Sequence, residues 1–254
     1  MFHGIFLRLW ANFKAGEIMK KCENSKNLKQ IALDCGCGDV GFAYVGDVLT
    51  GTIAGSLAGG AENLIYAVSL VYRLSDAVVD TITDCPTHTY FHHYRTVNAN
   101  LDRIMLECGK YIESMGFKYI PVASSQSIDK FEGLFQHKTA ARLAGLGTIG
   151  KSGLFLSKKY GARVRLGTIL TDMPLETGEP CTDDLCGDCK VCASLCPAMA
   201  ISGRKFSVED KDIIDRRACS EYMKKQFQHI GRGVVCGICM KNCAYTNNLK
   251  NRIL

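Results

Sequence analysis

The feature that most constrains this chain is a run of cysteines in its last third. Cys186, Cys189, Cys192 and Cys196 follow the spacing C-x2-C-x2-C-x3-C, and Pro197 closes the run. Three thiolates two residues apart fit the corners of one [4Fe-4S] cluster, while the fourth, carried further along the chain, reaches a second cluster. The run therefore predicts a partner segment that supplies the remaining ligands.

A partner segment follows the run. Cys236, Cys239 and Cys243 have the spacing C-x2-C-x3-C, and Cys219 lies between the two segments. Eight cysteines are the number that two clusters need. Compared with a ferredoxin, the second run lacks one of its closely spaced cysteines, and Cys219 stands earlier in the chain instead. We expect one cluster on Cys186, Cys189, Cys192 and Cys243, and the other on Cys196, Cys219, Cys236 and Cys239.

Two other uses of cysteine compete with clusters. Zinc sites usually take two Cys pairs separated by a longer spacer, which a third Cys only two residues beyond the first pair fits poorly. A disulfide framework suits small secreted domains rather than a chain of 254 residues. The spacing favours clusters over both alternatives.

The N-terminal stretch and the composition indicate the cellular setting. Residues 1–13 are apolar but interrupted by Arg8, and no small-residue cleavage site follows, so we expect an amphipathic helix rather than a signal peptide or membrane span. Fourteen cysteines without an export signal indicate a reducing, cytoplasmic compartment. The formal net charge of +6 suggests an anionic partner. Two clusters would offset about four of these charges, so the support for RNA binding is weak.

Residues 1–178 lack the dense cysteine pattern and alternate between helical and strand-like stretches, whereas residues 179–254 carry the clusters. The sequence predicts an α/β (mixed α+β) first domain and a ferredoxin-like second domain, with residues 176–184 as the linker. A helix should end at a glycine turn near Gly36. We expect strands at 42–45, 64–74 (buried on both faces), 117–122 and 164–170, and helices at 89–115 and 137–144.

The segment Tyr90–Arg95, YFHHYR, opens one of these helices. Its side chains would suit a metal, an anion or a ring-shaped cofactor. A helix start with solvated histidines and packed aromatic rings suits them better. The residues alone leave both interpretations open.

A glycine loop at residues 145–152 formally matches G-x-G-x-x-G and the phosphate-binding pattern G-x4-G-K-[ST]. Both motifs need a strand before the glycines and a helix after them. Here an Ala-rich helix comes first and the strand-like stretch 154–156 follows, which disfavours a P-loop ATPase. The backbone amides and Lys151 could still approach another bulky or anionic ligand.

Six cysteines fall outside the cluster count. The one-residue spacing of Cys35 and Cys37 is poor for a metal pair and favours a place in a turn, and Cys108 falls on the packed face of a helix. Cys181 precedes the cluster run and could shield a cluster. Cys22 and Cys85 receive no role from the sequence.

Four stretches together resemble the epoxyqueuosine reductase family and its relatives, the corrinoid reductive dehalogenases. They are residues 141–151, 186–197, 215–219 and 236–239. The resemblance implies a first domain that holds cobalamin, with Gly145, Gly147, Gly150 and Lys151 beside the corrin. It also implies clusters that pass single electrons to cobalt, and reduced cobalamin that reduces the substrate, which for epoxyqueuosine reductase is an epoxide on a tRNA nucleoside.

The chain departs from that family at two places. The family has an acidic, proline-containing segment that supplies the proton donor, whereas residues 127–134 lack the proline and Phe131 stands about where the acid is expected. Asp129 and Glu132 are the substitutes. The chain also ends at Leu254, without the C-terminal helical repeats that longer members use against tRNA.

The sequence therefore predicts an iron–sulfur reductase of the epoxyqueuosine reductase type, supplied by a low-potential donor such as ferredoxin or flavodoxin. Cobalamin is the expected second cofactor, and epoxyqueuosine in tRNA is the candidate substrate. The alternative is a ferredoxin-like electron carrier or accessory protein that docks a partner enzyme.

Overall fold

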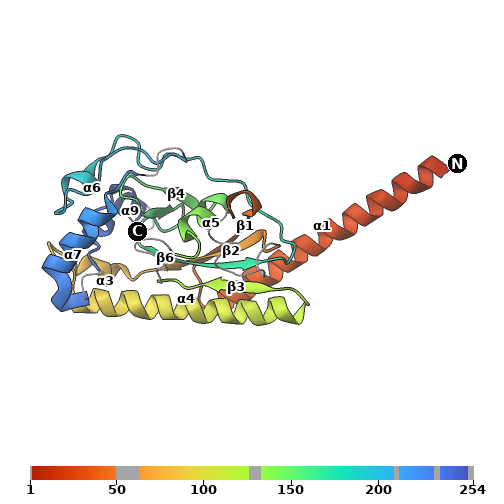
Figure 1. Ribbon diagram of the computed structural model, residues 1–254, viewed down its shortest axis with the longest axis horizontal. Helices are drawn as coiled ribbons and strands as arrows, with labels where there is room; N and C mark the ends of the chain where they lie inside the picture. The colour runs from red at the N-terminus through yellow and green to blue at the C-terminus, as the bar shows by residue number, and fades with distance from the viewer. Residues whose placement is uncertain (1, 50–62, 126–132, 209–211, 232–234, 251–254) are drawn as a thin grey trace.

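The computed structural model describes residues 2–49, 63–125, 133–208, 212–231 and 235–250, with side chains from residue 18 to residue 249 within these ranges. The chain begins with helix α1 (Phe2–Asp34), whose first half extends away from the rest of the molecule (Figure 1). The predicted glycine turn follows at Gly36, with φ of 91°. This conformation suits glycine and redirects the chain into the sheet.

A four-stranded antiparallel sheet forms the centre of the fold. Its strand order is β1-β2-β6-β3, so the last strand in sequence lies between two earlier ones. Val68 of β2 lies opposite Phe42 of β1 and Ile169 of β6. The strands are β1 (Asp39–Tyr44), β2 (Tyr66–Arg73), β3 (Tyr119–Val122) and β6 (Val164–Thr171).

Helices cover both faces of this sheet. The long helix α4 (His88–Ser114) packs on one face together with the C-terminal part of α1, and α5 (His137–Leu143) packs on the other (Figure 1). Alternate residues of β2 serve the two sides: Val68 joins the core under α4, and Ala67 joins the core under α5. The predicted strand at 64–74, buried on both faces, is confirmed.

The boundaries of α4 follow from its sequence. The Thr87 side chain caps the helix by accepting a hydrogen bond from the Tyr90 N–H at 3.1 Å. Gly116, with φ of 83°, ends it. Cys108 is fully buried on the inner face, as predicted, and burial raises the pKa of its thiol to about 12.

The predicted glycine loop contains a strand. β4 (Gly147–Ile149) pairs antiparallel with β5 (Phe155–Ser157) to form a small two-stranded sheet. Gly147 is needed there because a Cβ at this position would lie 2.0 Å from the Leu156 carbonyl oxygen. The glycines therefore allow close strand pairing, and residues 150–153 form the turn between the strands.

The cysteine-bearing part packs onto the first part of the chain. Residues 176–184 are irregular, as the predicted linker requires. Val235, Ile238 and Met240 join the core under α4, so the hydrophobic core crosses the expected boundary at residue 178, and the division into two domains stays a prediction. The helices of this part are α6 (Val191–Ser194), α7 (Arg216–Gly231), α8 (Ile238–Lys241) and α9 (Ala244–Lys250).

Two short elements complete the described fold. They are the single helical turns η1 (Gly46–Val48) and α3 (Asp76–Asp80). Asp76 and Asp80 of α3 pair with the buried Arg163 guanidinium at 3.1 and 2.6 Å, which ties α3 to the strand β6 region. Within the described ranges, no helix combines the length and the apolar character that a membrane span requires.

Candidate functional site

The eight cysteines of the cluster motif form two neighbouring groups. In the first, which we call site A, burial raises the pKa of Cys192 to about 11, and Cys186, Cys243 and Cys189 raise it further by repulsion. A cavity between α6 and α8 is lined by the same four residues. Site A is Cys186, Cys189, Cys192 and Cys243.

The second group, which we call site B, is defined in the same way. Burial raises the pKa of Cys219 to about 11, followed by repulsion from Cys236 and Cys196. The pKa of Cys239 is raised by burial and then by Cys236 and Cys219. Cys239 also lines the cavity of site A, so the two sites adjoin. Site B is Cys196, Cys219, Cys236 and Cys239.

In each site the thiols raise one another's pKa, because neighbouring thiolates would repel. Bound iron would neutralise this negative charge. Each set has the number of thiols that a [4Fe-4S] cluster would take as ligands. In the part of the chain that the structure describes, no three His, Cys, Asp or Glu side chains form a group that could hold a single metal ion.

A Cys-Gly pair begins each cysteine segment and turns the chain around its site. Gly187 has φ of 49° and Gly237 has φ of 88°. At Gly237 a Cβ would also lie 2.7 Å from Ile82 and 3.0 Å from Tyr90. Only glycine fits both the backbone conformation and the space.

A large cleft is lined in part by Met240, the residue that follows Cys239 of site B. Its volume is about 670 Å³, which is within the range of ligand and cofactor pockets. The residues that line it come from α4, α5, the β4–β5 turn, β6 and the segment that leads into α7. They include Tyr94, Ser124, Ser125, His137, Lys138, Ser152, Gly153, Phe155, Arg165, Arg216 and Met240.

Tyr94 and Arg165 form a polar pair in this cleft. The Arg165 guanidinium lies 4.4 Å from the centre of the Tyr94 ring, and the Tyr94 hydroxyl is 3.2 Å from Ser125 Oγ. Burial alone would raise the pKa of Tyr94, but Arg165, Ser125 and Asn98 together lower it below the ordinary value. The phenol therefore releases a proton more easily than an isolated tyrosine does.

Two further titratable groups line the cleft. Burial lowers the pKa of Lys138 to about 8, helped by repulsion from Arg216 and Arg165, and its ammonium donates to the Gly153 carbonyl at 2.8 Å. Burial lowers the pKa of His137 to about 4. His137 is neutral at pH 7, with Nε2 donating to the Ala123 carbonyl at 3.2 Å and Nδ1 accepting from Thr168 Oγ1 at 2.9 Å.

The side chains of the YFHHYR segment have different roles: some pack in the fold or are exposed, and one lines the cleft. Tyr90 is buried, and its hydroxyl lies 4.0 Å from Met240 Sδ, so it packs between the cleft and site B. His93 accepts a hydrogen bond from the Ser75 N–H at 3.0 Å, and His92 is exposed. Tyr94 alone of these four lines the cleft. Helical spacing placed Tyr94 on α4, but its contact with Arg165 depends on β6.

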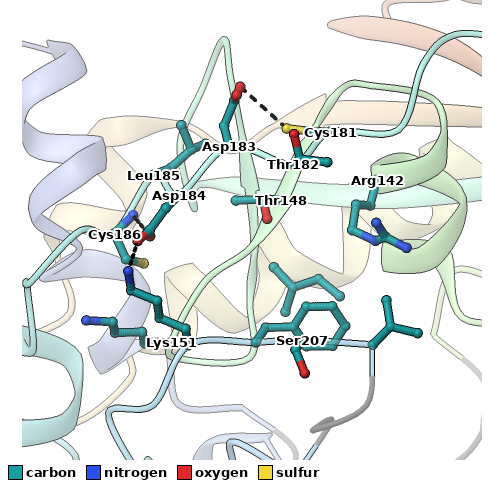
Figure 2. A pocket seen from close by; sticks show the side chains of 14 residues that line it. Arg142, Thr148, Lys151, Cys181, Thr182, Asp183, Asp184, Leu185, Cys186 and Ser207 are labelled. Carbon is teal, nitrogen blue, oxygen red and sulfur yellow. Dashed lines mark hydrogen bonds and ion pairs between the residues drawn. The ribbon is translucent and has the colours of Figure 1, made fainter.

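A smaller surface pocket of about 260 Å³ opens beside site A (Figure 2). Cys186 and Lys151 lie at one end of it and Arg142 at the other (Figure 2). Asp184 shapes this end by accepting hydrogen bonds from the N–H groups of Cys186 at 3.2 Å and Gly187 at 3.0 Å. Cys186 of site A therefore lines a surface pocket, whereas Met240, the neighbour of Cys239 of site B, lines the cleft.

Comparison with known proteins agrees with this arrangement. Residues 185–246 match the family model of a 4Fe-4S double cluster binding domain, a span that contains all eight cysteines. The epoxyqueuosine reductase of Staphylococcus aureus is 32% identical over 113 residues, covering 44% of this chain and 30% of that protein. This chain is thus similar in sequence to the epoxyqueuosine reductases. The resemblance seen in the sequence motifs is confirmed.

The chain is also similar to a reductive dehalogenase. The tetrachloroethene reductive dehalogenase of Sulfurospirillum multivorans is 28% identical over 144 residues, covering 54% of this chain and 27% of that protein. The matches thus span less than a third of the length of these two curated relatives.

Two solved structures share the fold. The catabolic reductive dehalogenase NpRdhA, in complex with 3-bromo-4-hydroxybenzoic acid, superposes with a TM-score of 0.68 at 18% identity, covering 89% of this chain and 32% of that one. An epoxyqueuosine reductase with an epoxyqueuosine-modified tRNA-Tyr stem loop gives a TM-score of 0.53 at 16% identity, covering 87% and 65%. These likenesses confirm the expected mixed α/β fold with a double-cluster part.

The four residues expected beside a corrin have contacts within the chain. A Cβ at Gly145 would lie 2.7 Å from the Glu179 carbonyl oxygen, and one at Gly150 would lie 3.3 Å from Cys186 Sγ. The Lys151 ammonium donates to the carbonyls of Gly187 and Cys189. The cleft is lined instead by the next residues of the turn, Ser152 and Gly153. Cofactor contact by Gly145, Gly147, Gly150 and Lys151 stays a prediction.

The motif that suggested a P-loop does not have the fold of one. Helix α5 precedes the glycines and strand β5 follows them, the reverse of the strand and helix that a P-loop needs. The expected proton donors Asp129 and Glu132 lie outside the described residues. Tyr94 belongs to the YFHHYR segment that the sequence singled out, whereas Lys138 and Arg165 are cleft residues that no sequence motif indicated.

Proposed function

We propose that this protein is an iron–sulfur reductase of the epoxyqueuosine reductase type, in which two clusters serve a cobalamin bound in the cleft. The observation that carries the proposal is that residues close in sequence to two site B cysteines line the cleft. Met240, which lines the cleft, directly follows Cys239 of site B. Arg216, which also lines it, precedes Cys219 by three residues.

The eight cysteines are the proposed cluster ligands, divided as sites A and B. Support comes from the two sets of mutually repelling thiols and from the double-cluster family match over residues 185–246. Cys196 follows Cys192 on the same segment but belongs to the other site, as the two-cluster rule requires. This chain crossing keeps the two sites adjacent.

The two sites face different surroundings, which gives electron transfer a direction. Site A adjoins the surface pocket through Cys186, where a small donor such as ferredoxin or flavodoxin could approach. Site B adjoins the cleft through Met240. Electrons would therefore enter at site A and leave from site B.

The cleft residues fit a bulky, partly apolar cofactor with a polar reaction space beside it. Ser152, Gly153, Leu154 and Phe155 form one wall and would hold the cofactor, with the glycines of the β4–β5 hairpin shaping that wall. When bound, cobalamin would supply a strongly reducing cobalt centre. The protein would supply position, shielding from water and protons.

Tyr94 is the proposed proton donor of the cleft. Its hydroxyl carries a proton at Oη, and the Arg165 guanidinium over its ring stabilises the phenolate that remains after transfer. The Lys138 ammonium is a second cation of the cleft, near enough to the Arg165 guanidinium to be repelled by it. Together these groups would stabilise negative charge that develops on a substrate during reduction.

The cleft also bears on the choice of substrate. Lys138, Arg165 and Arg216 line it, and no Asp or Glu is among the described residues that do so. This charge favours an anionic substrate over a cationic one. An epoxyqueuosine-modified stem loop, which a structural relative binds, is the substrate we propose to test first.

Metal content tests the proposal. Anaerobically reconstituted protein should hold about eight irons per chain. After mixing with hydroxocobalamin and desalting, it should retain near-stoichiometric cobalt and should then reduce the modified stem loop when a low-potential reductant is added. Eight irons without cobalt would instead support the electron carrier, and fewer than about eight would contradict the two-cluster assignment.

A further inference from the structure

Lys151 is a buried cation that the proposed chemistry does not use. It follows Gly150 in the β4–β5 turn, and its side chain is enclosed, with the residue 4% exposed. Its ammonium donates to the Gly187 carbonyl at 2.6 Å and to the Cys189 carbonyl at 3.1 Å. Both acceptors belong to the loop that carries two cysteines of site A.

These partners leave the charge of Lys151 without a counter-charge. Both are neutral carbonyls, and none of the ion pairs between described residues includes Lys151. A buried ammonium group is costly unless an opposite charge lies near it. An oxidised [4Fe-4S] cluster with four thiolates carries a net charge of about −2, and one-electron reduction makes it about −3.

The backbone around Lys151 brings its charge close to the first of these thiolates. Gly150 permits the approach, because a Cβ there would lie 3.3 Å from Cys186 Sγ and 2.8 Å from the Leu156 side chain. Lys151 follows Gly150 directly, so the turn that approaches Cys186 Sγ also holds the buried ammonium group on the loop of site A.

We propose that Lys151 is the buried counter-charge of the site A cluster and raises its reduction potential. A fixed positive charge stabilises the reduced cluster more than the oxidised one, since the reduced cluster is more negative. The Gly-Lys pair that imitates a phosphate-binding motif would then serve a different anion, the cluster itself. The inference rests on the cluster assignment proposed above and is independent of cobalamin and substrate.

Lys151→Gln separates charge from hydrogen bonding, because the Gln amide can still donate to a loop carbonyl. Lys151→Arg keeps the charge. The matched control is Lys205→Met, which removes a cation that also pairs with this loop, through Asp184 at 2.5 Å, but is 63% exposed. Water and salt screen such an exposed charge, so its removal should have little effect.

The test is a redox titration of the anaerobically reconstituted proteins, followed by electron paramagnetic resonance, with iron measured in each sample. In Lys151→Gln one cluster should become at least tenfold harder to reduce, which is 59 mV for a one-electron couple. The other cluster should be unchanged, and Lys151→Arg and Lys205→Met should titrate like the parent.

Each other outcome is decisive. Full iron with unchanged potentials in Lys151→Gln would mean that Lys151 only ties the loop in place, and the inference would be wrong. If Lys151→Gln loses iron, the same titration of Lys151→Arg decides: a parental potential with full iron supports the counter-charge, and loss of iron there too contradicts it. A parent with fewer than about eight irons would instead refute the cluster assignment.

Discussion

At the scale of single residues, Tyr94 is the group whose chemistry matters most for the proposed reaction. Its hydroxyl lies in the cleft near Ser125, under the influence of the Arg165 guanidinium. Tyr94→Phe removes the proton and leaves the ring in place. General acid catalysis typically contributes about 10²–10⁴-fold, so turnover should fall by at least about 100-fold.

Turnover of the cobalamin-loaded variant with the modified stem loop, measured beside iron and cobalt content, checks this prediction. Both metals should stay at parental levels, because Tyr94 is not among the proposed ligands. Tyr44→Phe is the control, since that tyrosine is 46% exposed on β1 and does not line the cleft. If Tyr94→Phe turns over at the parental rate, Tyr94 is not the proton donor and another group must supply the proton.

At the scale of elements, the β4–β5 hairpin connects the cluster part to the first part of the chain. Its turn carries Lys151 toward site A and Ser152 and Gly153 toward the cleft. The hairpin depends on Gly147, where a Cβ would meet the Leu156 carbonyl oxygen at 2.0 Å. A backbone carbonyl group held in strand pairing cannot move aside as the end of a flexible side chain can. The two strands would therefore have to separate.

Gly147→Ala should therefore destabilise the protein by about 1–3 kcal/mol. Thermal unfolding of the reconstituted protein should show a midpoint lower by roughly 5 °C, with weaker retention of iron. Gly167→Ala in β6 is the control, because its Cβ would meet side chains at 3.3 Å or more and little else must move. Equal midpoints for the two variants would contradict this account of the hairpin.

At the scale of the whole molecule, the two parts of the chain share one core. Val235, Ile238 and Met240 pack with residues of α4, and the Thr246 hydroxyl accepts a hydrogen bond from the Ala162 N–H at 2.8 Å. Removing residues 179–254 would expose apolar surface of the first part and leave that N–H without its partner.

A fragment of residues 1–178 should consequently unfold at a lower temperature than the full chain or aggregate. Circular dichroism and size-exclusion chromatography of the two proteins would compare them. A fragment that is monomeric and unfolds cooperatively at the parental midpoint would show instead that residues 1–178 form an independent domain, as the sequence suggested.

The local pattern of the chain determined much of the fold and of the cluster sites. Apolar runs predicted β2 and β6, and a helical stripe between Thr87 and Gly116 predicted α4, because burial and capping at these places act over neighbouring residues. Cysteine spacing predicts the division into sites A and B, because a cluster fixes how far apart its ligands can stand. The mutually repelling thiols follow the same division, and their assignment as cluster ligands stays a prediction.

Only the tertiary structure decided where chemistry could take place. Tyr94, Lys138 and Arg165 come from α4, α5 and β6, and no spacing along the chain shows that these three elements converge on one cleft. Lys151 likewise lies in a motif typical of phosphate binding. Because β4 pairs with β5, its ammonium group instead lies against the loop of site A, where it donates to the Gly187 carbonyl. Local sequence sets propensity and ligand spacing, whereas long-range packing sets which charges share a cavity.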